Sequence, residues 1–457
     1  MYTLRRFIVV AMMAVLLPAV LLAQASDTTA TTVASTHTAN RAAAPARTTT
    51  DSTTRATPTD STARATPRDA EPKTVVLPDG EEKSVLSHFT IVLDAAQIFQ
   101  SLSQKNDAGT LPALTPGFQA AAGNAHVYAT IVPGLDMYAE FYLSSKHHEG
   151  FLMDREGYLL IDSLPEFANI FGINRIFRVI DVKAGHFEVD YGNQHLTRSD
   201  NAEVQRNPLI GNYVVDPNTV EAGMEVTAHL GAVRVLGGIG NGGTVEDFQP
   251  GHKLSMHGKV WMEPKSKLFD VAASYYHVNQ SANPTSANGG SFTEMFSGNR
   301  SGSRYSGVLG LTDPEAGQLK IGKGQNLEAW QFDGSTKAAG FTVSGLFGVA
   351  NDMDINGSDP GTPDERWNYY GGEVKYDVLP IAYLTGRYSG ANTGMYKGTA
   401  ADARVDRIQV GLGYWLASPI LIKAEYVTQH YRGFTQDFIG DPRFHGLLLE
   451  ASASVAF

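Results

Sequence analysis

The strongest constraint on the fold is a repeated alternation of apolar and polar residues in segments of about ten residues. Within residues 220–230, for example, Val220, Met224 and Leu230 fall on one face, and Glu221 and Glu225 fall on the other. A period of two indicates a β-strand whose faces meet two different environments. Sixteen such segments begin near residues 87, 122, 137, 156, 178, 220, 232, 254, 268, 326, 339, 367, 381, 404, 420 and 444.

The lengths of the connections separate a membrane barrel from a soluble sandwich. Tight turns are expected at 133–136, 230–231, 263–266, 379–380 and 417–419, and long polar stretches occupy 101–121, 191–218, 280–325 and 351–366. Short turns on one rim and long loops on the other are typical of outer-membrane barrels. In hydrocarbon every backbone polar group must be paired, so the sheet has to close. We predict an all-β fold, a transmembrane antiparallel β-barrel of about 16 strands over residues 86–457, with 18 strands as the alternative if 303–323 forms a further hairpin.

The N-terminal segment predicts export. Arg5 and Arg6 precede an apolar run that ends in Ala23-Gln24-Ala25, which is the pattern of a signal peptide covering residues 1–25. Residues 26–85 are rich in Thr, Ala, Ser and Pro and are predicted to be a disordered periplasmic linker, because they offer too little apolar surface to bury. With an alternating last strand that ends on Phe457, this predicts the outer membrane of a Gram-negative-type bacterium as the location.

If lipid contacts the apolar faces of the strands, the opposite faces line the lumen. An uncompensated charge on the lipid face would cost about 2–4 kcal/mol at the bilayer midplane, so the charged positions are predicted to point inward. The predicted pore-lining residues are Asp181, Lys183, Glu221, Glu225, Arg234, His257, Lys259, Asp270, Glu373, Lys375, Arg387, Arg407, Lys423, Glu425 and Glu450. A barrel of this size leaves a water-filled lumen unless something plugs it, and no plug domain is evident.

The third long loop, 191–218, is the candidate constriction. It carries five charged or titratable residues that could narrow the lumen, namely His195, Arg198, Asp200, Glu203 and Arg206. The alternative is that this loop forms an external cap.

Two segments carry a resemblance to a known family. Asp181-Val-Lys-Ala-Gly-His-Phe-Glu-Val-Asp-Tyr-Gly192, followed by Arg206-Asn-Pro-Leu-Ile210, resembles the phosphate-selective porin O/P family, over some thirty residues. The resemblance implies a sixteen-stranded, commonly trimeric channel for small anions. Glu188 and Asp190 stand where that family has lysine and proline.

The charge balance favours a different selectivity. Up to Lys73 the chain has eight basic and five acidic residues, which leaves 28 basic and 42 acidic residues, a net charge of −14, in residues 74–457. A phosphate channel needs guanidinium groups that can pair with phosphate, and no arginine ladder is visible. The hypothesis from the residues is a general or weakly cation-preferring pore for passive diffusion of small hydrophilic solutes, with phosphate or other anions as the alternative implied by the resemblance.

Other chemistry is weakly indicated. Asp352, Asp354, Asn356 and Asp359 match the first half of a calcium loop, but the glutamate expected at its twelfth position is missing, so an Asx-rich turn is the alternative. Cysteine is absent, which excludes thiol catalysis, and neither a Gly-x-Ser-x-Gly nor a His-Glu-x-x-His motif occurs, so no enzyme and no cofactor are expected.

The expected partners follow from the barrel prediction. They are outer-membrane lipids, small hydrophilic solutes, the barrel-assembly machinery through Phe457, and two further copies in a homotrimer; the net charge of −11 argues against nucleic acid. The alternative functions are a structural or adhesive barrel and a channel for hydrophobic substrates.

Overall fold

The computed structural model describes most of the predicted barrel region. The described residues are 74–76, 82–84, 88–144, 153–164, 169, 172–242, 254–262, 264, 268–279, 295–296, 304–311, 316–321, 326–352, 365–396, 399–435 and 439–457. The predicted signal peptide lies outside them, as does the linker except for an antiparallel pair of three-residue strands, β1 (Thr74–Val76) and β2 (Glu82–Ser84).

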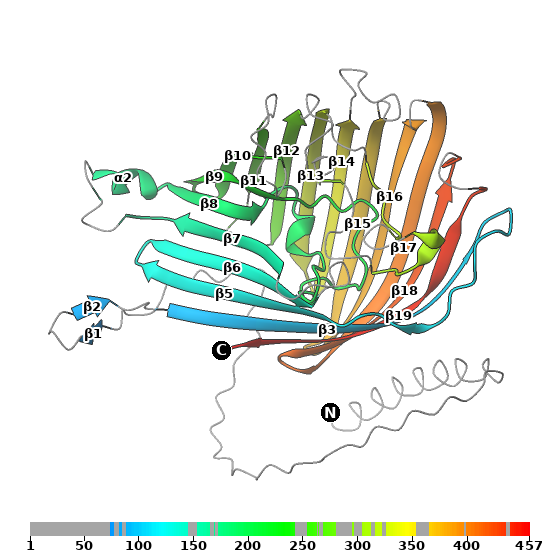
Figure 1. Cartoon of the computed structure of the whole chain (residues 1–457), viewed down its shortest axis with the longest axis horizontal. Helices are drawn as coiled ribbons and strands as arrows, with labels where there is room; N and C mark the ends of the chain where they lie inside the picture. The colour runs from blue at the N-terminus through cyan, green and yellow to red at the C-terminus, as the bar shows by residue number, and fades with distance from the viewer. Residues whose placement is uncertain are drawn as a thin grey trace, which may run out of the picture. The chain divides into compact units, whose positions relative to one another are not determined.

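Sixteen antiparallel strands close into a barrel, and a two-residue strand, β4 (Gly117–Phe118), adds a short pairing to β3 (Figure 1). The first eight barrel strands are β3 (His88–Lys105), β5 (Ala122–Val132), β6 (Leu135–Ser144), β7 (Met153–Ile161), β8 (Ile180–Glu188), β9 (Val220–Leu230), β10 (Val233–Gly240) and β11 (Ser255–Met262). The other eight are β12 (Phe269–Asn279), β13 (Asn326–Ala338), β14 (Phe341–Asp352), β15 (Glu365–Leu379), β16 (Ala382–Tyr396), β17 (Thr399–Ala417), β18 (Ile420–Arg432) and β19 (Arg443–Ala456). Pairing of β19 with β3 completes the ring.

The sixteen-strand prediction is confirmed, and every strand begins within five residues of its predicted start. The eighteen-strand alternative is wrong. Described residues 304–311 and 316–321 contain no strand, only a single turn of 3-10 helix, η4 (Val308–Gly310). Most of these residues are buried and apolar. They pack inside the barrel and do not form a further hairpin in its wall.

The two rims differ as expected from the loop lengths. On one rim, two residues join β9 to β10 and two join β13 to β14. In the second of these turns Ala339 and Gly340 both have positive φ, 51° and 81°. That conformation is typical of the two-residue turns whose twist matches the strands they join. The loops between β8 and β9 and between β12 and β13 leave from the opposite rim.

The two faces of the wall have opposite chemistry. Val374 is 44% exposed, whereas the adjacent Glu373 is 8% exposed, and the same alternation recurs along the barrel. The outward face carries large apolar side chains, as a lipid-facing surface requires. None of the described helices is long and apolar enough to cross a membrane.

Apolar side chains fill part of the barrel interior, where the sequence predicted a water-filled lumen. A cluster of buried apolar residues joins inward side chains of the wall, such as Trp367 and Tyr369, to residues of the long connections, such as Tyr213 and Tyr305. No plug domain is expected from the sequence, yet residues of the β8–β9 connection and the described residues 304–311 and 316–321 between β12 and β13 pack against the inner face of the wall (Figure 1).

Candidate functional site

The charged residues predicted to face inward lie on the inner face of the wall. Ten are buried: Glu221, Glu225, His257, Lys259, Glu373, Arg387, Arg407, Lys423, Glu425 and Glu450. Five are half-buried: Asp181, Lys183, Arg234, Asp270 and Lys375. Side chains along an open pore would be solvated, so the burial of the ten shows that other parts of the chain cover them.

Three basic side chains of the inner wall, Arg387, Lys423 and Lys183, are paired with carboxylates. The Arg387 guanidinium lies 2.5 Å from Glu373, and the Lys423 ammonium lies 2.7 Å from Glu450. Lys183 forms an ion pair with Glu225, which lies directly opposite it on the neighbouring strand. These pairs neutralise much of the positive charge that an anion passing through the lumen would meet.

The connection between β8 and β9, residues 189–219, is called the inner loop here. Asn201 donates to Gly123 O on β5, while Arg387 on β16 donates to Gly211 O of the same loop at 2.8 Å. The loop N–H of Gly192 donates to the Ser274 hydroxyl on β12 at 3.0 Å. Contacts with strands so far apart around the ring place the inner loop inside the barrel and not above it.

Two adjacent inward residues of β18 hold the middle of the inner loop. The Glu425 carboxylate accepts the N–H groups of Ile210 at 2.7 Å and Gly211 at 2.9 Å. The Lys423 ammonium donates to the carbonyls of Val204, Asn207 and Leu209 at 2.8, 3.1 and 2.9 Å. A carboxylate and an ammonium two residues apart thus satisfy buried backbone groups that would otherwise be unpaired inside the barrel.

Four of the five residues proposed for the constriction lie together on the inner loop, and His195 lies apart from them. Arg198 and Asp200 are buried, and Asp200 lies 2.9 Å from Arg155 of β7 and 3.2 Å from Arg198. Glu203 and Arg206 pair with each other at 3.0 Å and are partly exposed. His195 is partly buried and lies 3.2 Å from Asp190. The structure therefore brings Arg198, Asp200, Glu203 and Arg206 together on the inner loop, with His195 nearer β11 and β12.

The ion pairs of the inner loop shift the pKa values of its members. Burial opposes ionisation of Asp200, but the guanidinium groups of Arg155 and Arg198 hold the pKa of this carboxyl well below its usual range. Burial lowers the pKa of His195 from its ordinary value of 6.5 to about 4, although Asp190 favours the charged imidazole. At neutral pH the inner loop is thus held by an ionised Asp200 and a neutral His195.

The depressed pKa of His195 predicts a pH dependence. An undocked loop binds a proton at His195 near pH 6.5 and the docked loop only near pH 4, so docking weakens as the pH falls through this window. We expect the midpoint of thermal unfolding in detergent to fall more steeply from pH 6.5 to pH 4 in the wild type than in His195→Gln. Equal slopes in the two proteins would contradict this assignment.

A second inward segment was not foreseen from the sequence. It comprises the described residues 295–296, 304–311 and 316–321 of the connection between β12 and β13. The Tyr305 hydroxyl donates to Glu425 at 2.7 Å, and Leu319 N–H donates to Val214 O at 2.9 Å. Glu425 therefore anchors both the inner loop and this second inward segment.

Arg155 and His126 were not predicted as functional residues from the sequence. Arg155 is 1% exposed and joins the wall to the inner loop through Asp200 and Asn218. His126 on β5 hydrogen-bonds Asp94 on β3 at 2.7 Å. The period-two pattern of β5 assigns His126 to the inner face, but the distance to Asp94 depends on strand register, which the sequence does not contain.

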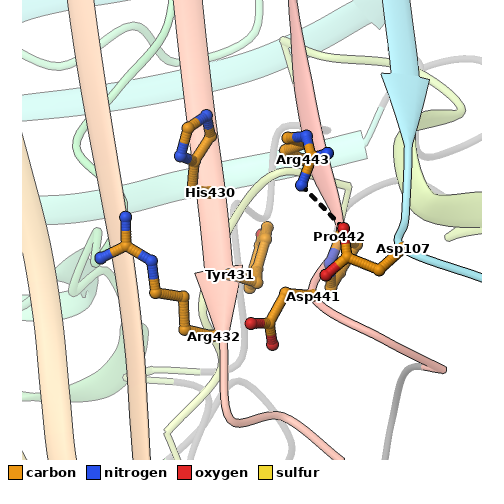
Figure 2. Close-up of a pocket in the computed structure, with 7 residues that line it drawn as sticks. All are labelled: Asp107, His430, Tyr431, Arg432, Asp441, Pro442 and Arg443. Atoms are coloured by element: carbon orange, nitrogen blue, oxygen red, sulfur yellow. Dashed lines mark hydrogen bonds and ion pairs between the residues drawn. The ribbon is translucent and has the colours of Figure 1, made fainter.

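A polar pocket of about 170 Å³ lies at the rim that carries the long loops, apart from the inner loop (Figure 2). It is lined by Asp107, His430, Tyr431, Arg432, Asp441, Pro442 and Arg443. Arg443 donates to Asp107 at 3.0 Å across it. His430 and Arg432 are on the outward face of β18, whereas Tyr431 between them is buried on its inner face.

The candidate calcium ligands are described only in part. Asp352 ends β14 and is buried, whereas Asp354, Asn356 and Asp359 lie outside the described residues. A calcium site there stays a prediction. Its test is protection of the segment 353–364 from proteolysis when CaCl₂ is added.

No protein-family model and no curated protein shows a significant match to this sequence. The barrel does match solved structures. The outer membrane channel DcaP of Acinetobacter baumannii matches with a TM-score of 0.51 and 11% identity, over 80% of this chain and 96% of that chain. The anion-selective porin from Comamonas acidovorans matches with a TM-score of 0.50 and 12% identity, over 80% and 99% of the two chains.

This chain has the barrel fold of outer-membrane porins. OprB of Pseudomonas putida also matches, at a TM-score of 0.45 and 11% identity over 80% of this chain and 94% of that one. The narrower resemblance to phosphate-selective porins is not confirmed by these matches, because they establish the fold and not the solute.

Proposed function

We propose that the chain is a general porin, through which small hydrophilic solutes and ions diffuse passively with a weak preference for cations. Three features support this: the porin barrel, the charges of both signs on its inner face, and an inner loop docked across the interior. Solutes would pass beside the inner loop, whose charged residues 198–206 would set the size and charge preference.

The proposal on selectivity rests on the buried contacts of the lumenal guanidinium groups. Arg387 donates twice to Glu373, and Arg198 donates to Asp216 through two nitrogens. Arg407 donates to the side chain of Gln429 and to two backbone carbonyls. Guanidinium groups engaged in this way cannot offer phosphate a bidentate partner without breaking buried contacts. Selective phosphate transport, the alternative implied by the sequence resemblance, therefore has little support in this arrangement.

The reversal potential in asymmetric KCl tests this proposal. We expect a small potential of the sign that indicates cation preference, because residues 74–457 carry a net charge of −14 and the lumenal Lys183, Arg387 and Lys423 are paired with carboxylates. A large potential of the opposite sign, abolished by millimolar phosphate, would overturn the proposal in favour of an anion channel.

One observation favours a second candidate function. The apolar packing of the two inward segments against Trp367, Tyr369 and Phe444 resembles a protein core more than a wet channel. A barrel closed in this way would serve a structural role and would not conduct. Absence of conductance from a correctly folded barrel would support this candidate.

The C-terminal strand supports the proposed interaction with the barrel-assembly machinery. Phe457 N–H donates to Ile91 O at 2.9 Å, and the Phe457 side chain is 73% exposed. We expect Phe457→Ala to lower the amount of protein in the outer membrane several-fold while leaving refolding in detergent intact. Equal surface amounts of wild type and variant would contradict a targeting role.

The outward apolar surface is also where copies of the chain would meet. We propose a homotrimer, in line with the family resemblance, whose contacts would bury part of this surface. Native mass spectrometry from detergent should then give three chains per particle, and a single chain would contradict it.

A further inference from the structure

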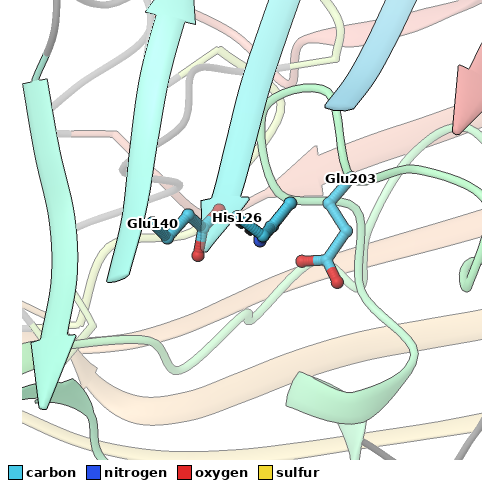
Figure 3. A group of neighbouring side chains, drawn as sticks. All are labelled: His126, Glu140 and Glu203. Atoms are coloured by element: carbon cyan, nitrogen blue, oxygen red, sulfur yellow. Dashed lines mark ion pairs between the residues drawn. The ribbon is translucent and has the colours of Figure 1, made fainter. Parts of the chain in front are cut away.

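Three potential metal-binding side chains converge inside the barrel, between the wall and the inner loop (Figure 3). They are His126 of β5, Glu140 of β6 and Glu203 of the inner loop, and their ligand atoms lie within 4.8 Å of one another. The His126 Nδ1 and the Glu140 Oε1 are 4.0 Å apart, and both side chains are 4% exposed. The Glu203 side chain is 31% exposed, so it is the member of the group that is free to adjust.

A neighbouring carboxylate orients the histidine. The His126 Nε2 lies 2.7 Å from Asp94 Oδ2, so the Nε2–H donates to Asp94 and Nδ1 is the nitrogen that a metal ion would bind, with release of its proton. Nδ1 faces Tyr138 Oη, 2.8 Å away, and Glu140; because the Tyr138 hydroxyl donates to Glu140, Nδ1–H donates to Tyr138 when no metal ion is bound. Metal-binding histidines are oriented by carboxylates in this manner, because the hydrogen bond fixes the tautomer and raises the basicity of the other nitrogen.

The surroundings of Glu140 favour a cation. Glu140 lies directly opposite Glu156 in the β6–β7 pairing, and both side chains are buried. Like charges placed opposite each other across strands destabilise a sheet. The Glu140 carboxylate accepts a hydrogen bond from Asn124 at 2.9 Å and one from Tyr138 at 3.3 Å, and the His126 imidazole is 4.0 Å away. A divalent cation next to Glu140 would relieve this repulsion.

We propose that His126, Glu140 and Glu203 bind a divalent transition-metal ion of the Zn²⁺ class. The donors would be Nδ1 of the imidazole and one oxygen of each carboxylate, with water as the remaining ligand. An imidazole with carboxylates suits Zn²⁺ and its neighbours, whereas Mg²⁺ and Ca²⁺ take oxygen ligands. Metal–ligand bonds of about 2.0–2.2 Å require the donor atoms to move closer by roughly 1 Å, which the partly exposed Glu203 allows.

The bound ion would join the inner loop to the wall. Glu203 lies in a short turn of the inner loop, where it pairs with Asp200 through two backbone hydrogen bonds of 2.8 and 3.0 Å. His126 and Glu140 belong to adjacent strands of the wall. Zn²⁺ would therefore stabilise the docked position of the inner loop, whether or not the barrel conducts ions.

Calorimetric titration of the refolded, untagged full-length chain with ZnCl₂ tests this proposal. We expect one saturable site per chain, with an affinity lowered at least about tenfold in His126→Gln and in Glu203→Gln, and no competition from MgCl₂. His229→Gln is the matched control, because His229 also pairs with a carboxylate, Asp181, at 2.6 Å but lies outside the proposed site. Its affinity should equal that of the wild type.

Three outcomes would overturn the metal site: no saturable binding by the wild type, binding unchanged in Glu203→Gln, or binding lost in His229→Gln. Glu203→Gln alters a partly exposed loop residue, so this variant keeps the test decisive even if His126→Gln does not fold. Heat modifiability on gels verifies the folding of each variant. Since the readout is binding, failure of the metal site leaves the proposed porin function untouched, and failure to conduct leaves the metal site untouched.

Discussion

Replacing Glu425 with alanine is expected to raise the single-channel conductance several-fold. This carboxylate accepts hydrogen bonds from the N–H groups of Ile210 and Gly211 in the inner loop and from the Tyr305 hydroxyl in the second inward segment. Its removal leaves these buried donors without their acceptor, at a cost of about 1–3 kcal/mol for each. Both segments should then spend more time away from β18, which widens the path for ions.

Asp377→Ala serves as the control for Glu425→Ala. Asp377 is also an inward-facing carboxylate, but it pairs with Lys375 near the short-turn rim and is 48% exposed. Its replacement should leave the conductance close to that of the wild type. If the single-channel conductance of Glu425→Ala is no higher than that of Asp377→Ala, the inner loop does not limit the passage of ions through the barrel.

Replacing Arg155 with alanine is expected to undock the first half of the inner loop. The Arg155 guanidinium lies 2.9 Å from Asp200 and 3.2 Å from Asn218, and its side chain is 1% exposed. Removing one partner of a buried ion pair typically costs about 3–5 kcal/mol. We expect trypsin to cut the folded variant after Arg198 or Arg206 under conditions in which the wild type stays intact.

Arg443→Ala is the matched control for the trypsin digestion of Arg155→Ala. Arg443 pairs with Asp107 at 3.0 Å, but the two side chains are 35% and 60% exposed. Exposed pairs contribute about 0–1 kcal/mol, so this variant should resist trypsin as the wild type does. Equal resistance of the Arg155 and Arg443 variants would show that the Arg155 pair does not hold the inner loop.

The strands of the barrel wall could be predicted because their residues alternate between apolar side chains facing outward and polar side chains facing inward. Glu221 and Glu225 were assigned inward from the pattern alone, and they are 0% and 1% exposed, whereas Met224 is 43% exposed on the outward face. The strand count follows from the same alternation. A one-residue slip would have placed charges in lipid, so the pattern constrains the register of each strand against the membrane.

The filling of the lumen could not be predicted in the same way. Residues 280–325 have no period of two or of 3.6, so nothing in them indicates that Tyr305 would contact Glu425 on β18. Nor does the sequence show that His126 would lie opposite Glu140, because that contact depends on cross-strand register. The inner loop was a candidate constriction from its position and charges, but its anchors Arg155 and Lys423 are known only from the fold.

The single-channel conductance of the refolded full-length chain in a planar bilayer tests the central claim most directly. The account predicts stepwise openings in symmetric KCl for the wild type, and larger steps for Glu425→Ala. A heat-modifiable, correctly folded barrel that conducts no ions, both as the wild type and as Glu425→Ala, would contradict the porin function and leave the barrel with a structural role.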